Sequence, residues 1–160
     1  MKRTFATEEA LGAGAAAVAV AWRDAAIAPL LVGLVGELGA GKTAWARAML
    51  RGLGHAGRVP SPTYTLLEHY EIGALTVVHL DLYRLNEAQE LDFLGLRDWL
   101  AVPNVWILAE WPERSDAFAA SLDLTLALEI LPEQARAVTM TARTERGRAA
   151  AAALADIDFK

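Results

Sequence analysis

The segment LLVGLVGELGAGKT, residues 30–43, decides the fold class. Its first half, residues 30–35, is apolar at successive positions, a pattern that predicts a strand buried on both faces, as in parallel sheets. Its second half, residues 36–43, matches G-x-x-x-x-G-K-[ST] in full, and residues 43–51 then predict a helix that Gly52 closes. A strand, a glycine-rich turn and a helix in this order predict a phosphate-binding loop.

The residue types of this loop suit a triphosphate. Glycines let successive backbone N–H groups turn toward phosphate oxygens, and the start of the helix adds the positive end of its dipole. We expect Lys42 to place its ammonium on the β- and γ-phosphates and Thr43 to offer its hydroxyl to magnesium. The alternative, a glycine-rich turn with a surface lysine, is disfavoured by the strand and helix around it. The expected nucleotide contacts are Glu37, Leu38, Gly39, Ala40, Gly41, Lys42 and Thr43.

Hydrophobic patterning over the rest of the chain predicts a single P-loop domain over residues 1–160. We expect a three-layer α/β fold of the P-loop NTPase type, with a mixed, mostly parallel sheet, helices on both faces and a C-terminal antiparallel hairpin. The expected strands are 66–71, 75–80, 105–109, 122–130 and one through 138–140. The expected helices are 7–28 with Thr7 as its cap, 86–100 opened by the capping box Asn86-Glu87-Ala88-Gln89, and 148–155.

Composition excludes several classes of protein. With no cysteine in 160 residues, a disulfide scaffold, a cysteine-ligated zinc site, an iron–sulfur cluster and a cysteine nucleophile are ruled out. A net charge of -5 disfavours a uniformly basic surface for nucleic acid. The apolar run 11–22 is shorter than the roughly twenty residues of a membrane span, and the acidic Glu8 and Glu9 before it disfavour a signal peptide. We therefore expect a cytoplasmic protein without membrane contact.

Two acids follow buried strands. Asp81 follows residues 75–80, and Glu110 follows residues 105–109. We expect both strands to be parallel neighbours of strand 30–35, which would bring both acids to the carboxyl edge of the sheet, where ligands bind. One acid would bind magnesium or its water and the other would orient the attacking water, and the sequence leaves open which does which. Each acid has the alternative of being only a loop residue or a helix cap.

Other polar and aromatic residues give weaker signals. The hydroxyl-rich segment 61–65, with Thr63, could sense a γ-phosphate, although an ordinary turn is the plainer interpretation. Trp111 could pack against a nucleotide, although half-buried tryptophan in a core is more common. His79 is interpreted as a packing residue rather than a base, and no spacing of His, Asp and Glu indicates a zinc site.

Some P-loop subclasses are disfavoured because their signatures are absent. The chain has neither Asn-Lys-x-Asp, which reads guanine, nor the Ser-Gly-Gly signature of transporter ATPases. A small-molecule kinase remains open, with residues 143–148 as the arginine cluster available for a lid. A nucleotide-dependent binding module without significant catalysis is a second alternative.

Four motifs together resemble one family. They are GELGAGKT at 36–43, SPTY at 61–64, HLDLYR at 79–84 and EWP at 110–112. In this order and spacing they are similar to the TsaE (YjeE) family, small bacterial P-loop ATPases required for the threonylcarbamoyladenosine (t6A) modification of tRNA. The departures are small: Glu37 replaces the usual aspartate, Ala44 a common second threonine and Ala10 a frequent N-terminal threonine.

The resemblance implies roles for the matched residues. Lys42 and Thr43 match nucleotide and magnesium residues, and Thr63 matches a switch threonine. Asp81 matches an acid important for hydrolysis, Glu110 a metal-associated acid, and Trp111 the tryptophan beside it. Lys42, Asp81 and Glu110 are thus the expected catalytic residues, and Thr43, Asp81 and Glu110 the expected magnesium residues.

The resemblance also implies a cofactor and partners. A member would use ATP and Mg²⁺ and would act on the TsaB–TsaD heterodimer, which modifies adenosine 37 of tRNAs reading codons that start with A. ATP hydrolysis would reset that complex between turnovers. The chain would meet tRNA only indirectly, through the complex.

Overall fold

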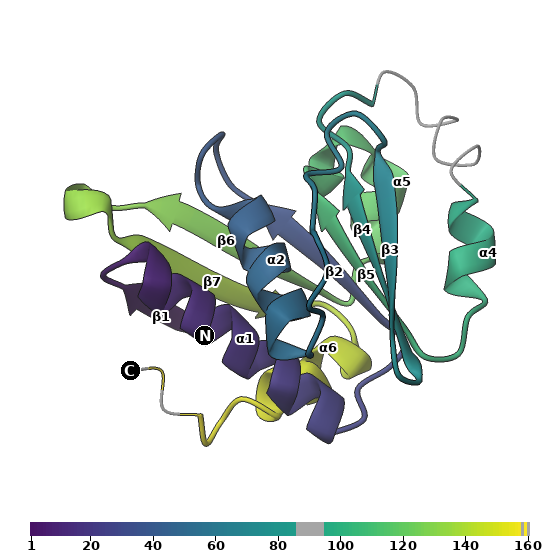
Figure 1. Ribbon diagram of the computed structural model, residues 1–160, viewed down its shortest axis with the longest axis horizontal. Helices are drawn as coiled ribbons and strands as arrows, with labels where there is room; N and C mark the ends of the chain where they lie inside the picture. The colour runs from purple at the N-terminus through teal and green to yellow at the C-terminus, as the bar shows by residue number, and fades with distance from the viewer. Residues whose placement is uncertain (86–94, 158, 160) are drawn as a thin grey trace.

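The chain folds around a mixed β-sheet in the computed structural model (Figure 1). The structure describes residues 1–85, 95–157 and 159. These residues form a seven-stranded sheet in the order β1-β7-β6-β2-β5-β4-β3. The strands are β1 (Lys2–Phe5), β2 (Leu30–Val35), β3 (Leu67–Ile72), β4 (Leu75–Asp81), β5 (Val105–Glu110), β6 (Leu124–Ile130) and β7 (Arg136–Ala142).

The centre of the sheet is parallel and its margins are antiparallel. β2 pairs in parallel with β5 and β6, and β5 pairs in parallel with β4. β2 and β5 are buried at almost every position, as their continuous apolar sequences require. β3 pairs antiparallel with β4, β7 with β6, and β1 with β7. The predicted α/β fold, with a mixed sheet and a C-terminal antiparallel hairpin, is confirmed.

The strand order corrects one prediction. β5 lies between β2 and β4, so β4 is not a direct neighbour of the strand that precedes the glycine-rich loop. The hairpin of β3 and β4 occupies the margin, and the chain returns to insert β5 next to β2. The register still aligns Leu34 with Glu110 and Glu110 with Asp81. Both acids therefore lie at the same carboxyl edge.

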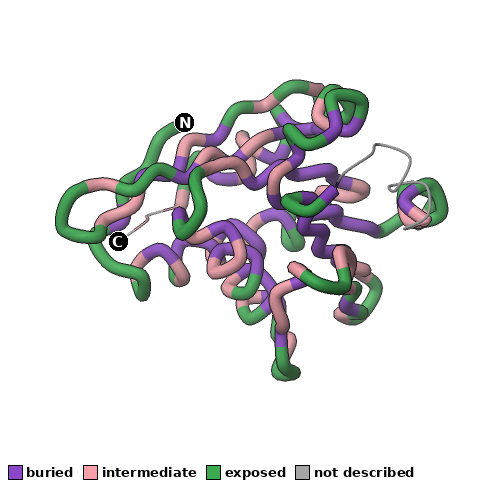
Figure 2. Tube along the Cα trace, turned by 90° about the horizontal axis from the view of Figure 1, so that it is seen from above, coloured by how far each residue is buried: buried purple, intermediate pink, exposed green. Residues whose placement is uncertain are grey.

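Helices cover both faces of the sheet. The helices are α1 (Glu8–Asp24), α2 (Lys42–Gly52), α4 (Leu96–Leu100), α5 (Asp116–Ser121) and α6 (Glu145–Ala152), with short 3-10 turns η1 (Pro112–Arg114) and η2 (Pro132–Gln134). One core contains Trp22, Trp45 and Trp106 and lies under α1, α2 and α6. The other contains Ile107 and Phe118 and lies under α4 and α5. Figure 2 shows buried segments through the middle of the molecule and exposed ones at its outer turns.

The first helix is shorter than predicted. Thr7 caps it, since its side chain accepts a hydrogen bond from the Ala10 N–H. The helix ends at Asp24 instead of continuing toward residue 28. Ala26 has a left-handed φ of 53°, and the Ile27 N–H reaches back to the Trp22 carbonyl over 2.9 Å, which is the hydrogen-bond pattern of a Schellman stop. Because an alanine stands where glycine is usual, no residue before Pro29 indicates a helix stop.

Two elements were not predicted, and one prediction is only partly covered. β1 and α5 are too short for a periodic signal. The capping box at 86–89 and the predicted helix as far as residue 94 lie outside the described residues. Within the rest of that predicted range the structure describes α4, which starts after Gly95. Over the described ranges, none of the helices has the length and apolar character that crossing a membrane requires.

Candidate functional site

A cavity of about 790 Å³ opens at the carboxyl edge of the parallel strands. It is lined by the glycine-rich loop, the first turns of α1 and α2, the ends of β4 and β5, and the turn before β7. The lining residues are Ala6, Thr7, Glu8, Leu11, Leu38, Gly39, Gly41, Lys42, Thr43, Ala44, Ser61, Thr63, Asp81, Tyr83, Arg84, Glu110, Trp111, Glu133, Gln134 and Arg136. This is the edge at which open α/β sheets bind their ligands.

The glycine-rich loop depends on glycine at its two ends. Gly36 has a φ of 147°, and a Cβ there would collide with the carbonyl oxygen of Leu128. Gly41 has a φ of 108° and is the N-cap of α2, where no side chain caps the helix. The first N–H groups of α2 are therefore left for a ligand, together with the positive end of the helix dipole. Glu37 is exposed outside the cavity, and Ala40 is buried in the core, so of the loop residues expected to touch nucleotide these two do not line the cavity.

Lys42 lies inside the loop. Its Nζ donates hydrogen bonds to the carbonyl oxygens of Gly36 at 2.6 Å and Glu37 at 2.9 Å. The ammonium also lies 3.8 Å from the centroid of the Trp111 ring, a cation–π contact. Burial lowers the pKa of Lys42 below its ordinary 10.5, and the nearby carboxylates, Glu110 foremost, partly offset this. The site thus holds a desolvated cation beside its backbone amides.

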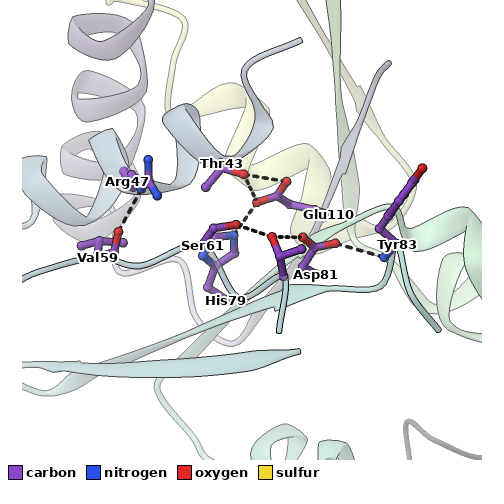
Figure 3. A network of polar contacts seen from close by, with 9 residues as sticks. Thr43, Arg47, Val59, Ser61, His79, Asp81, Tyr83 and Glu110 are labelled. Carbon is purple, nitrogen blue, oxygen red and sulfur yellow. Dashed lines mark hydrogen bonds and ion pairs between the residues drawn. The ribbon is translucent and has the colours of Figure 1, made fainter. Parts of the chain in front are cut away.

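Thr43 and Glu110 are joined directly. The Thr43 hydroxyl donates to both carboxylate oxygens of Glu110, at 2.8 and 3.0 Å. Glu110 is only 3% exposed, and its Oε1 also lies 2.8 Å from Nε2 of His79. Figure 3 shows Glu110 between the hydroxyl of α2 and the imidazole of β4. Two of the three residues expected at the magnesium site, Thr43 and Glu110, therefore lie together.

Asp81 lies on the other side of the site, with the 61–65 segment. Its Oδ2 accepts a hydrogen bond from Thr63 Oγ1 at 3.3 Å, and its Oδ1 accepts one from the Tyr83 N–H at 3.0 Å (Figure 3). The Thr63 hydroxyl is also 2.7 Å from that of Ser61. The serine–threonine segment is thus attached to the acid that ends β4. An ordinary turn, the plainer interpretation of its sequence, does not require this contact.

Tyr83, Arg84 and Trp111 line the cavity and contact further aromatic and arginine side chains. The Trp111 ring, above Lys42, packs against the Tyr83 ring at a centroid distance of 5.0 Å. Arg114 lies 5.2 Å from the Tyr83 centroid, and Arg84 lies 4.7 Å from the centroid of Tyr64. Trp111 is half-buried and has a left-handed φ of 57°. It is therefore a cavity residue as well as a packing residue.

Sequence reasoning missed Arg136 and gave His79 only a packing role. Arg136 donates from Nε to the Ala40 carbonyl at 3.1 Å and from Nη2 to the Gly39 carbonyl at 3.4 Å, so it holds the loop from β7. Only the three-dimensional structure brings these residues together, because they are almost a hundred positions apart. The arginines of 143–148, considered for a kinase lid, are not among the residues that line the cavity.

The oxygen donors of the site fit magnesium held together with phosphate. The hydroxyl of Thr43 and the carboxylates of Glu110 and Asp81 are hard oxygen ligands of the kind Mg²⁺ prefers. In the part of the chain that the structure describes, no group of three or more His, Cys, Asp and Glu side chains is placed to hold a metal ion. Mg²⁺ in nucleotide sites is commonly bound by one or two carboxylates plus substrate phosphates.

Comparisons with known proteins agree with the four motifs. The family model described as "Threonylcarbamoyl adenosine biosynthesis protein TsaE" matches residues 4–139. The chain is 40% identical over 119 residues to "tRNA threonylcarbamoyladenosine biosynthesis protein TsaE" of Haemophilus influenzae, covering 74% of each chain. It is 33% identical over 109 residues to the Bacillus subtilis protein of that name, covering 68% of this chain and 67% of the relative.

The fold is also similar to a solved structure. The crystal structure of YdiB from Bacillus subtilis matches with a TM-score of 0.70 and 25% sequence identity, over 96% of this chain and 93% of that one. The family match includes all four motifs, and the Haemophilus influenzae relative covers 74% of this chain. This chain therefore belongs to the TsaE family.

Proposed function

We propose that this chain is a Mg²⁺-dependent ATPase that serves the t6A modification of tRNA through the TsaB–TsaD heterodimer. One observation supports the ATPase assignment above all others. Lys42, the open N-terminus of α2, Thr43, Glu110 and Asp81 all line one cavity. A cation, free amides and two acids at one place match what phosphoryl transfer requires, which is positioning and electrostatic stabilisation of the phosphates.

The triphosphate would bind along the glycine-rich loop. Lys42 would exchange its two carbonyl partners for phosphate oxygens, which are anionic and so accept stronger hydrogen bonds. The uncapped N–H groups at the start of α2 would donate to the same phosphates. Magnesium, when bound, would neutralise charge on the β- and γ-phosphates.

The contacts of the two acids support a division of labour that the sequence left open. Glu110 accepts the hydrogen bond of Thr43, so these two residues would hold the magnesium ion or its water. Asp81 instead contacts Thr63, on the 61–65 segment. We assign Asp81 and Thr63 to the attacking water, which must lie on the far side of the γ-phosphate from its leaving oxygen.

The t6A role follows from the family. The relatives bear the name of tRNA threonylcarbamoyladenosine biosynthesis proteins, and the family model matches residues 4–139 of this chain. With a net charge of -5, the chain would reach tRNA through its partners rather than by its own surface. We place the protein in the cytoplasm, where its tRNA substrate would be made and modified.

A phosphate-release assay with purified TsaB and TsaD tests the proposal. The chain alone should hydrolyse ATP slowly, addition of the heterodimer should raise the rate, and both rates should require Mg²⁺. Asp81→Asn should no longer hydrolyse ATP but should still bind it. In Glu110→Gln, Mg²⁺ should no longer increase the rate of hydrolysis. Labelled phosphate that appears on a metabolite instead of as free phosphate would favour a small-molecule kinase. Unchanged hydrolysis in Asp81→Asn would contradict the assigned role of that acid.

A further inference from the structure

His79 lies in the core of the site without an assigned role. Its side chain is fully buried, with 0% exposure, on the same face of β4 as Asp81 two residues later. Its Nε2 lies 2.8 Å from Oε1 of Glu110. Its Nδ1 is buried and has no hydrogen-bond partner among the residues that the structure describes. A packing histidine would be expected to have both ring nitrogens satisfied or facing solvent.

The contact with Glu110 determines which ring nitrogen bears the proton. An ionised carboxylate only accepts hydrogen bonds, so Nε2 must be the donor. In the neutral ring Nδ1 is then a bare acceptor, and burying it without a partner costs less than burying an unpartnered N–H of a charged ring. The opposite tautomer would put an unpaired N–H donor in the core and would set two acceptors against each other. The arrangement therefore requires hydrogen on Nε2.

This hydrogen bond fixes the Glu110 carboxylate from the side of the sheet. Oε1 accepts from His79 and from Thr43, whereas the hydrogen bond to Oε2 comes from Thr43 alone. A carboxylate held by hydrogen bonds from two sides is less free to rotate than one held from a single side. Histidines and hydrogen-bonded carboxylates around metal sites commonly orient the ligands in this way.

We propose that His79 is a positioning residue that orients Glu110 for magnesium through its Nε2–H. The inference rests on the proposed function, because it names the residue that prepares Glu110 for the ion. His79 is not among the residues that line the cavity: its role is to hold the acid that Thr43 shares. This role requires that Nε2 donate a hydrogen bond to Glu110, and it requires no hydrogen-bond partner for Nδ1.

The tautomer can be measured without nucleotide or turnover. In the free protein labelled with ¹⁵N-histidine, long-range proton–nitrogen spectra at a fixed neutral pH distinguish protonated from unprotonated ring nitrogens. We expect His79, assigned by its absence in His79→Gln, to show hydrogen on Nε2 and none on Nδ1. Hydrogen on Nδ1 with a bare Nε2 would overturn the proposal, whether or not the protein hydrolyses ATP.

Two substitutions separate positioning from packing. Glutamine places an amide nitrogen three bonds from Cβ, as Nε2 is in histidine, whereas asparagine places it two bonds away, as Nδ1 is. Calorimetry measures the dissociation constant of ATP with and without Mg²⁺. The value compared is the ratio of the constant without Mg²⁺ to the constant with Mg²⁺. His79→Asn should reduce that ratio by about tenfold or more, the usual cost of losing an orienting partner, and His79→Gln should keep most of it.

The outcomes also separate this proposal from the function beneath it. If the wild-type chain gains no ATP affinity from Mg²⁺, the proposed function fails, while the tautomer measurement still tests the contact with Glu110. If the wild type gains affinity and His79→Asn gains as much, the positioning role is wrong. If both variants lose the ratio and unfold equally early in urea, His79 is a packing residue and the proposal is also wrong.

Discussion

Replacing Lys42 with methionine removes one charge and leaves an unbranched side chain one heavy atom shorter. In the free protein the ammonium donates to the carbonyls of Gly36 and Glu37, 2.6 and 2.9 Å away, and both are neutral acceptors. On binding ATP, these bonds would be exchanged for bonds to anionic oxygens in a site where Lys42 is only 4% exposed. A hydrogen bond between charged groups is worth about 1.5–3 kcal/mol. At 1.4 kcal/mol for each factor of ten, the variant should bind ATP–Mg²⁺ about 10- to 150-fold more weakly.

Isothermal titration of ATP into the free chain, in the presence of Mg²⁺, measures this loss. Lys2→Met is the matched control, because it makes the same chemical change at an exposed lysine paired with Glu129, 3.0 Å away. That control should bind ATP like the wild type, since exposed ion pairs contribute little. A Lys42→Met protein that is folded and binds ATP–Mg²⁺ as tightly as the control would refute the assignment of the glycine-rich loop as the phosphate site.

Other substitutions should affect stability or turnover in distinct ways. Tyr70→Phe should change stability little near neutral pH, because no described residue bonds its buried hydroxyl. Burial raises the Tyr70 pKa above 10.0, so the unfolded chain releases this proton at a lower pH than the folded protein. The free energy of unfolding therefore falls as the pH rises past 10.0. Urea unfolding should show a smaller fall at alkaline pH in Tyr70→Phe. Asp123→Ala should lower the free energy of unfolding by about 3 kcal/mol. The buried Asp123 carboxylate accepts hydrogen bonds from the Leu31 N–H at 2.9 Å and from Thr144 Oγ1 at 2.6 Å, and both would be lost. An unchanged urea midpoint would contradict this prediction. Thr63→Ala should slow phosphate release while leaving ATP affinity unchanged, and weaker binding with normal turnover would contradict its pairing with Asp81.

Much of the fold could be predicted from residues 30–43 because the patterns in this segment are local. A strand buried on both faces needs a continuous apolar run, and a loop that turns its N–H groups toward one point needs glycines at fixed places. Both requirements appear in consecutive residues, so the α/β class, β2 and α2 could be predicted. The position of Asp81 and Glu110 at one edge of the sheet needed only the rule that parallel strands end there, although their direct pairing was not predicted.

The parts that could not be predicted depend on distant residues. Nothing near Asp81 says that β5 will insert between β4 and β2, because strand order is decided by packing of the whole sheet. Arg136 reads as one polar residue of an alternating strand, and its bonds to the glycine-rich loop exist only after β7 pairs beside β6. The early end of α1 depends on an alanine in a left-handed conformation that glycine would have signalled.

The site shows the same division between local and distant information. The residue types at 42, 43, 81 and 110 indicated phosphate and magnesium chemistry, because that chemistry limits which side chains serve. The proposed division of roles between the acids could not be predicted, since it rests on the contact of Thr43 with Glu110 and of Thr63 with Asp81. His79 appeared to be a packing residue for the same reason: its partner, Glu110, is on another strand.

The most direct test of the central claim is to locate ATP–Mg²⁺ on the free chain by amide chemical-shift mapping. The account predicts that saturating nucleotide shifts the backbone signals of residues 36–43 most strongly, with further shifts at Thr63, Asp81 and Glu110. It also predicts little change at Trp22 and Leu53, which line a separate cavity of about 410 Å³. Shifts concentrated around those two residues, or none at all along the glycine-rich loop, would contradict it.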